Sequence, residues 1–349
     1  MKKYSYLPLT SRYKDCELKI FKGSLHYEGE PEVEEPYNKG LTLLSSKCND
    51  GWGYVKNISV FTDEAWPMPN RLELRYVITN DIRCYAIDTP LNPEQAAEIW
   101  DKQKQEFPES PFLYYVVGTA PYGVVAVWLS GRDRSVLIHS FVAEEKELDK
   151  MEEHFLGWQK GQKIYMPVSH EQMELNMRQF CYRYVTLEEH WDNRQWKWVE
   201  YEDDDPYYDD LLIDSVEDHR IDGSFNYVMG DMSQLDYHEA GMPDRITVRW
   251  HAGREEYMAH FWIEKDDFSK LFTKYCGMHP GSRIDILLRM DTKEQVYVIA
   301  LKAEDEQKAT PLPWYLFQLI VFKDGTEHYK SPNYRLEKGQ WSWTRIKKK

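Results

Sequence analysis

The sequence predicts an α+β fold: two copies of an antiparallel β-meander unit, each with one packed helix, joined by a helical and acidic linker segment. Aromatic residues make up 15% of the 349-residue chain, which favours β-rich structure because Tyr and Trp suit half-buried pleated surfaces. Strand-like alternation and helix-start signals also recur in the same order at two places. The chain is longer than the sequence that usually folds around one hydrophobic core. We therefore expect a first unit over residues 1–143, a helical connector over 144–190 and a second unit over 191–349.

The repeat is clearest in two predicted strands. Residues 69–76 (PNRLELRY) and 243–250 (PDRITVRW) share the order Pro, polar, Arg, aliphatic, polar, aliphatic, Arg, aromatic. This alternation is typical of a strand with one buried face. After a two-residue difference the register continues, so that VVAVWL at 124–129 falls on VYVIAL at 296–301. We interpret this agreement as two copies of one unit.

A helix is expected in each copy between the predicted strands. In the first copy Asn92 is a good N-cap, Pro93 suits the first helical position, and Gln95 stands where a capping box wants Glu or Gln. In the second copy Asp266 and Asp267 put negative charge on the first turn, where the helix dipole favours it.

The stretch between the copies has a different character. Residues 144–155 and 169–185 show helical spacing, and Ser169 with Gln172 makes another capping-box pattern. Residues 200–222 then carry 11 acidic side chains among 23. We expect a long, partly mobile surface segment there, ahead of the second copy.

Two local patterns are interpreted as structural rather than chemical. In residues 120–131 (APYGVVAVWLSG), Pro121 and Gly123 suit a turn between two strands, and no G-x-S-x-G elbow makes Ser130 a nucleophile. His251 and His260 lie in predicted strands around a turn and lack the H-E-x-x-H spacing of a zinc site. We therefore expect no metal and no cofactor.

Charge and cysteine usage limit the partners and the compartment. A net charge of −15 repels phosphate backbones, which excludes nucleic acid, and it speeds encounter with a basic protein. Five cysteines lie far apart without a C-x-x-C pair, which favours a reducing compartment. We find no signal peptide, lipoprotein leader or membrane-length apolar run, and expect a cytoplasmic protein unless a leader was removed.

The segment around the acidic tract is the predicted partner-binding surface, because aromatic anchors stand there among the charges. The residues assigned to it are Trp198, Tyr201, Asp203, Asp204, Asp205, Tyr207 and Tyr208. Three other interpretations of this region stay open: a solvated flexible run, calcium binding by the carboxylates, and sugar stacking on the Trp cluster.

The alternative hypothesis is a small-ligand-binding protein or hydrolase with a cleft between the two repeated units, since ligands often settle at domain interfaces. The pocket residues assigned to it are Tyr122, Trp128 and His139. No catalytic residues are assigned.

Several of these segments resemble an uncharacterised bacterial family, the domain of unknown function DUF2931, and its Bacteroidetes members most. The resemblance rests on residues 69–76, the LNPE helix start at 91–94 and VGTAPYGVVAVWLSG at 117–131. Tyr122 departs from the family, which has a second Gly there, and Tyr76 replaces a Trp. Many relatives are lipoproteins, but no leader is found here. The resemblance implies no activity.

Some of these relatives are encoded beside secreted antibacterial effectors, which implies an immunity role for part of the family. The function predicted for this chain is therefore non-enzymatic protein binding. The narrower hypothesis is an immunity protein that blocks an antibacterial effector.

Overall fold

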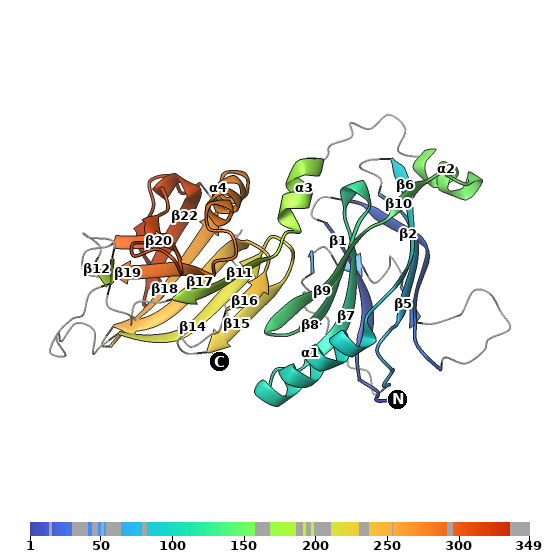
Figure 1. The fold of residues 1–349 in the computed structure, drawn as a ribbon, viewed down its shortest axis with the longest axis horizontal. Helices are drawn as coiled ribbons and strands as arrows, with labels where there is room; N and C mark the ends of the chain where they lie inside the picture. The colour runs from blue at the N-terminus through green and yellow to red at the C-terminus, as the bar shows by residue number, and fades with distance from the viewer. Residues whose placement is uncertain are drawn as a thin grey trace. The chain divides into compact units, whose positions relative to one another are not determined.

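The structure is a computed structural model in which the chain divides into two compact units. Unit 1 comprises Met1–Gln179, Arg220–Asn226 and Ala240–Met242, and unit 2 comprises Phe180–His219, Tyr227–Glu239 and Pro243–Lys349. The described residues are 1–13, 16–29, 41–43, 48–49, 52–53, 64–78, 82–157, 168–185, 191–192, 197–198, 211–229, 237–252, 254–291 and 296–335. Within these residues the fold is mostly β-sheet with four α-helices, as an α+β class requires (Figure 1).

The first sheet of unit 1 has the strand order β9-β8-β7-β1-β4. Strands β7, β8 and β9 form an antiparallel meander, whereas β1 lies parallel to β7 and to β4. Phe225 and Asn226, at the start of β15 (Phe225–Met229), pair with β9 on the side away from β8. The bounds are β1 (Leu7–Arg12), β4 (Cys48–Asn49), β7 (Phe112–Thr119), β8 (Val124–Gly131) and β9 (Arg134–Val142).

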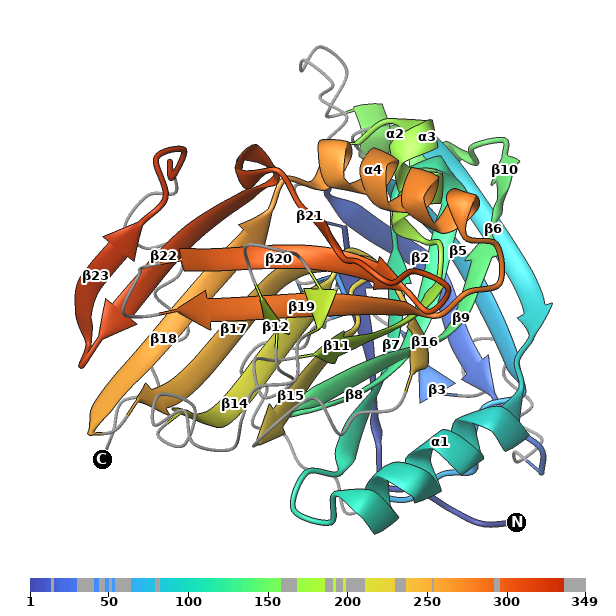
Figure 2. The ribbon, with the colours of Figure 1, turned by 60° about the vertical axis from the view of Figure 1, so that its left-hand side comes forward.

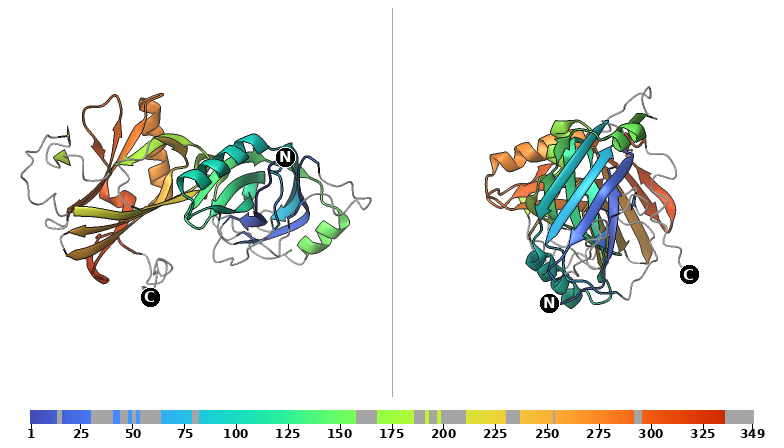
Figure 3. Two further views of the ribbon diagram at one scale, coloured as in Figure 1. Left: turned by 90° about the horizontal axis from the view of Figure 1, so that it is seen from below. Right: turned by 90° about the vertical axis from the view of Figure 1, so that its right-hand side faces the viewer.

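The second sheet of unit 1 has the order β10-β6-β5-β2-β3, with every neighbouring pair antiparallel. Its long strands are seen nearly face on in the right panel of Figure 3. Leu72, Leu74 and Tyr76 of β5 are buried between charged neighbours, as the alternation predicted. The bounds are β2 (Leu18–His26), β3 (Leu41–Thr42), β5 (Arg71–Ile78), β6 (Arg83–Pro90) and β10 (Glu144–Lys146).

Helix α1 (Pro93–Glu106) lies beside β7 and closes one end of the core of unit 1 (Figure 1). The predicted start is confirmed: the side chain of Asn92 accepts a hydrogen bond from the backbone N–H of Gln95 at 3.0 Å. Trp100 on its buried face packs edge-on against Tyr6 and at a tilt against Phe112 of β7. A large aromatic pair of this kind stabilises the core beyond the area that it buries.

The predicted turn between the two strands is confirmed: β7 and β8 are joined by a short 3₁₀ segment, η2 (Pro121–Gly123). Gly123 has φ +78°, and a Cβ there would lie 2.5 Å from the backbone oxygen of Ala143. Glycine is therefore required both by the backbone conformation and by the close approach of a neighbouring chain segment.

The two helical predictions for the connector are only half right. Helix α2 (Lys150–Gly157) is preceded by strand β10, and α3 (His170–Asn176) is followed by strand β11 (Phe180–Val185). The capping prediction at Ser169 is confirmed, since its hydroxyl accepts from the N–H of Gln172 at 3.1 Å. The helical spacing fails on either side because pairing with β6 and β19 satisfies those backbones as strands.

Unit 2 has five neighbouring strands in one sheet and a second sheet of five strands. One has the order β23-β22-β18-β17-β14 and the other the order β16-β11-β19-β20-β21, in which β11 lies parallel to β19. The first sheet has the bounds β14 (Leu211–Arg220), β17 (Pro243–Ala252), β18 (Glu255–Ile263), β22 (Phe317–Lys323) and β23 (Thr326–Lys330). The second has β16 (His238–Ala240), β19 (Ile284–Asp291), β20 (Val296–Ala303) and β21 (Thr310–Pro311) in addition to β11.

Helix α4 (Lys265–Met278) runs alongside the sheet of β19 and β20 (Figure 2). Phe272 packs edge-on against Phe180 and Tyr182 of β11, and stacks on Phe268 of its own helix. A short 3₁₀ segment, η4 (Trp314–Leu316), leads into β22 and exposes Trp314 and Tyr315. No helix among the described residues is long and apolar enough to cross a membrane.

The acidic tract predicted over residues 200–222 has a second half that belongs to the fold. Residues 211–220 form β14, and Asp218 and Asp222 are fully buried. Both oxygens of the Asp222 carboxylate are occupied: Oδ1 accepts from the N–H and hydroxyl of Ser224, and Oδ2 accepts from Gln179 and from the N–H of Gly241. These hydrogen bonds allow a carboxylate to be buried without an adjacent cation.

Candidate functional site

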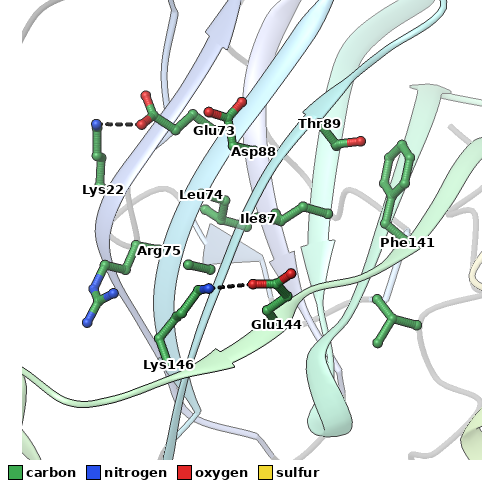
Figure 4. A pocket seen from close by; sticks show the side chains of 12 residues that line it. Lys22, Glu73, Leu74, Arg75, Ile87, Asp88, Thr89, Phe141, Glu144 and Lys146 are labelled. Atoms are coloured by element: carbon green, nitrogen blue, oxygen red, sulfur yellow. Dashed lines mark hydrogen bonds and ion pairs between the residues drawn. The ribbon is translucent and has the colours of Figure 1, made fainter.

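An open groove of about 620 Å³ lies on unit 1, over β2, β5, β6, β9 and β10 (Figure 4). One part of its lining is charged, with Lys22, Glu73, Arg75, Asp88, Glu144 and Lys146. The other part is apolar apart from Thr89, with Leu74, Ala86, Ile87, Phe141 and Val142. An open groove with one charged and one apolar wall suits a binding surface with a polar rim.

The charged wall follows from strand alternation on the second sheet. Glu73 and Asp88 lie opposite each other on β5 and β6, on the face turned away from the core. Glu73 pairs with Lys22 at 2.5 Å, and Asp88 accepts hydrogen bonds from Nε and Nη2 of Arg71, each at 2.6 Å. Each of these carboxylates therefore enters the groove already paired with a cation.

The same pairing holds two carboxyl groups of the groove ionised. A hydrogen bond from Arg71 lowers the pKa of Asp88, and one from Lys146 lowers the pKa of Glu144. A general acid that works near neutral pH needs a raised pKa instead. The arrangement thus suits recognition of charge rather than proton transfer.

Arg75 connects the groove to helix α2. Its guanidinium donates to both oxygens of the fully buried Glu152 at 2.6 and 2.7 Å, and to the backbone oxygen of Glu147 at 2.9 Å. The hydrogen bond from Arg75 lowers the pKa of Glu152. Because Leu156 of the same helix also packs on Val77, α2 is fixed over one end of the sheet.

The apolar wall lies beside the part of β6 that does not pair with β10. Strand β10 pairs only with Cys84, Tyr85 and Ala86. Among the described strands, the remaining residues of β6, 87–90, pair with β5 alone. Val142, at the end of β9, stands beside this stretch in the groove lining and is 73% exposed. The groove therefore runs along an open sheet edge.

The three alternative pocket residues take separate roles. Trp128 is fully buried, and its indole N–H donates to the backbone oxygen of Asp222 at 3.2 Å. His139 accepts a hydrogen bond from the N–H of Asn92 at 3.2 Å, and burial lowers its pKa. Tyr122 lines a second hollow of about 340 Å³, and its hydroxyl donates to the backbone oxygen of Val168.

The predicted partner-binding residues fall mostly beyond what the structure describes. Trp198 belongs to a two-stranded hairpin of β12 (Trp191–Asp192) and β13 (Lys197–Trp198), in which Trp191 and Trp198 are opposite each other. The other residues of that surface lie outside the described residues: Tyr201, Asp203, Asp204, Asp205, Tyr207 and Tyr208.

Unit 2 holds a cluster of titratable side chains on β14, β17 and β18. Glu217 contacts Nε2 of His219 at 2.5 Å and a guanidinium nitrogen of Arg245 at 3.1 Å. His260 is fully buried and meets the hydroxyl of Thr247 at 2.9 Å. Burial, followed by the charge of Arg245, lowers the pKa of His260 to about 3, so its ring is neutral at ordinary pH.

The two histidines weighed as metal ligands lie apart. His251 is opposite Glu256 in the β17–β18 ladder and pairs with Asp214 at 2.7 Å, whereas His260 is opposite Thr247. Over the described part of the chain no group of three or more His, Cys, Asp or Glu side chains is placed to hold a metal ion.

The groove was not predicted from the sequence, although the strand that carries two of its charged residues was predicted. Glu73 and Arg75 lie in the repeated strand that predicted the duplication, and their alternation was interpreted only as that of a strand with one buried face. The lysine and carboxylate residues of β2 and β5 were the sequence signal that could have predicted a charged wall. The open edge of β6 has no counterpart in the pattern, because it depends on where β10 joins the sheet.

Residues 33–186 match the family described as Protein of unknown function (DUF2931). The family resemblance inferred from the sequence is confirmed for this stretch, and the narrower assignment to its Bacteroidetes members stays a prediction. No curated protein and no solved structure matches the chain. The matched stretch contains β5, β6, β9 and β10, which provide the groove lining apart from Lys22.

Proposed function

We propose that this chain, which carries a DUF2931 segment over residues 33–186, is a non-enzymatic protein-binding protein that holds its partner in the groove of unit 1. The observation that carries the proposal is the meeting of an apolar wall, a rim of paired charges and an open strand edge. Interfaces combine these features: an apolar centre supplies affinity, and a polar rim supplies orientation.

A protein partner fits the groove better than a small molecule does. The groove is open along β6, whereas small ligands are held in concave sites that bury most of their surface. Its ion pairs stay solvated at the rim, so a partner need not strip an unpaired charge of water. The net charge of −15 favours a basic partner through steering. The immunity role and the contribution of the acidic tract stay predictions.

We also propose that the two units are copies of one ancestral unit. Helices α1 and α4 each have 14 residues, and Lys265 follows Pro93 by 172 positions, as Ile284 of β19 follows Phe112 of β7. The strand orders support the proposal, because β9-β8-β7-β1-β4 is matched by β21-β20-β19-β11-β16 with the same parallel pair in the middle. The second sheets agree likewise, with β6-β5-β2 matched by β18-β17-β14.

Affinity capture tests the proposed function. The full chain, immobilised through either terminus, would be exposed to extract of its own organism and washed at low and then high salt. The parallel baits would be Val142→Lys, in the groove, and Met151→Lys on α2, a comparably exposed apolar residue outside the groove lining. A protein held by the wild type and by Met151→Lys but lost by Val142→Lys supports the proposal. Equal capture by all three baits contradicts it.

A further inference from the structure

The two units differ at one sheet edge. In unit 2, β22 pairs with β18 from Tyr257 to Ile263, and its first residue, Phe317, lies opposite Ile263. In unit 1 the corresponding strand, β10, begins at Glu144 opposite Ala86. When α1 and α4 are aligned, residues of unit 2 correspond to residues of unit 1 with numbers lower by 172, so Ile263 corresponds to Leu91. Strand β22 therefore begins opposite the equivalent of Leu91, whereas β10 begins opposite Ala86, five residues away along the chain.

The stretch of β6 that β10 leaves open is the stretch beside the apolar wall of the groove. In unit 2 this place is filled by the first half of β22, whose Phe317 and Leu319 are buried. In unit 1 Ile87 and Phe141 are only partly buried, although both pack on the core, and Val142 is exposed. Among the described strands, the unit 1 edge thus leaves backbone groups of residues 87–90 without a strand partner, although Pro90 has no N–H, and it has the apolar surface that a further strand would cover.

We propose that residues 87–90 of β6 receive an extended segment of a partner protein, which adds to the second sheet of unit 1 as an antiparallel strand. Its inward side chains, at alternate positions, are apolar and cover Ile87 and Phe141, and its outward side chains lie beside the paired charges of the groove. The inference rests on the proposed function and specifies the mode of binding: main-chain pairing supplies affinity, and the apolar wall supplies selectivity.

The test uses the full chain and a synthetic peptide that carries the sequence of β22, FQLIVFK, with two lysines added at each end for solubility. This peptide has the chemistry of the strand that fills the corresponding edge of unit 2. Binding would be measured by fluorescence anisotropy to the wild type, to Val142→Lys and to the control Met151→Lys. We expect Val142→Lys to weaken binding at least about tenfold and Met151→Lys to change it less than about twofold. Unchanged circular dichroism checks that both variants are folded.

Two further peptides separate strand addition from simple apolar contact. Each has backbone N-methyl groups at alternate residues, one peptide at odd and the other at even positions. Because only alternate N–H groups of an added strand face the sheet, one pattern abolishes binding and the other leaves it within about threefold of the unmodified peptide. Equal effects of the two patterns would overturn strand addition while leaving the groove as a binding surface.

The register of the added strand can be trapped by a disulfide. His260 lies opposite Ile320 in unit 2, and His260 corresponds to Asp88 of β6. With Asp88→Cys in the chain, a peptide with Cys at the Ile320 position should cross-link faster than peptides with Cys one residue to either side, and wild-type protein serves as the control. Equal rates at the three positions would overturn the register.

Two other outcomes overturn the inference without deciding the proposed function. Absence of peptide binding to the wild type excludes a strand of this chemistry, and partner capture then remains the test of the groove. Self-association of the wild type that Val142→Lys abolishes, seen by sedimentation velocity, would make a second copy of this chain the occupant in place of a partner.

Discussion

The buried ring of His260 should make unit 2 lose stability as the pH falls, and His260→Asn should remove that loss. Burial and the nearby Arg245 and Arg249 lower the pKa of His260 from 6.5 to about 3, against the opposing charge of Glu217. Between these two values the unfolded chain binds a proton that the folded chain does not. The free energy of unfolding therefore carries no penalty from His260 above about pH 6.5, and it decreases as the pH falls from 6.5 towards 3.

The size of the effect follows from the two pKa values. Each pH unit between them changes the free energy of unfolding by about 1.4 kcal/mol, so at pH 4.5 His260 costs the folded state about 2.7 kcal/mol relative to pH 7.5. His260→Asn keeps a polar partner for Thr247 and does not titrate. The variant should be less stable than the wild type at pH 7.5, and this deficit should shrink by about 2.7 kcal/mol at pH 4.5.

Urea unfolding, followed by far-ultraviolet circular dichroism at pH 7.5, 6.5, 5.5 and 4.5, measures the difference in free energy of unfolding between the wild type and His260→Asn. The difference is taken from the unfolding transition that the substitution shifts. His170→Asn, at a histidine whose side chain is 61% exposed in unit 1, is the matched control, and its curves should stay parallel to the wild type. A deficit for His260→Asn that stays constant within about 0.5 kcal/mol over this range would refute the reasoning, because the ring would then titrate alike in both states.

Three further predictions concern unit 1, each measured by thermal or urea unfolding. Asp222→Ala should cost about 3 kcal/mol or more, since it leaves several buried donors without an acceptor; a loss below about 1 kcal/mol would contradict this. Glu152→Gln should cost about 2 kcal/mol by breaking the pair with Arg75. Because the pKa of Glu152 is lowered, that cost should be present above about pH 4.5 and fade as the pH falls below it. Gly123→Ala should destabilise more than Gly29→Ala: both glycines have positive φ, but only Gly123 has backbone in the space of a Cβ. Equal losses would contradict the steric part of that argument.

The helix starts and the long strands could be predicted because their signals are local. Asn92 and Ser169 cap helices through hydrogen bonds to residues three positions on, and such pairs are visible in any sequence. The alternation of residues 69–76 likewise places its own aliphatic side chains in the core. The parallel pairing of β1 with β7 and of β11 with β19 could not be predicted, because it joins segments far apart in the chain without a local pattern.

The acidic residues show why composition alone misleads about function. Residues 200–222 appear as one solvated tract, yet Glu217 pairs with Arg245 inside unit 2, and Asp222 is the buried centre of a turn. Whether a carboxylate steers a partner or stabilises a core depends on the donors around it. Several of these donors are distant in sequence: Arg245 of β17 for Glu217, and Gln179 and the N–H of Gly241 for Asp222. Part of the negative charge assigned to steering is therefore structural.

The open edge of β6 follows from a difference that no repeat pattern contains. Two units with the same strand order should present the same edge, and in unit 2 the seven residues of β22 cover it. Strand β10 has only three residues, Glu144–Lys146, and the chain then enters α2, which Arg75 and Glu152 fix over the sheet. Because β10 has three residues and β22 has seven, the described strands leave a sheet edge beside the apolar wall in unit 1, whereas β22 covers the edge of β18 in unit 2. If binding resides there, charge reversal at Lys323 of β22 should leave partner capture unchanged, whereas Val142→Lys should abolish it.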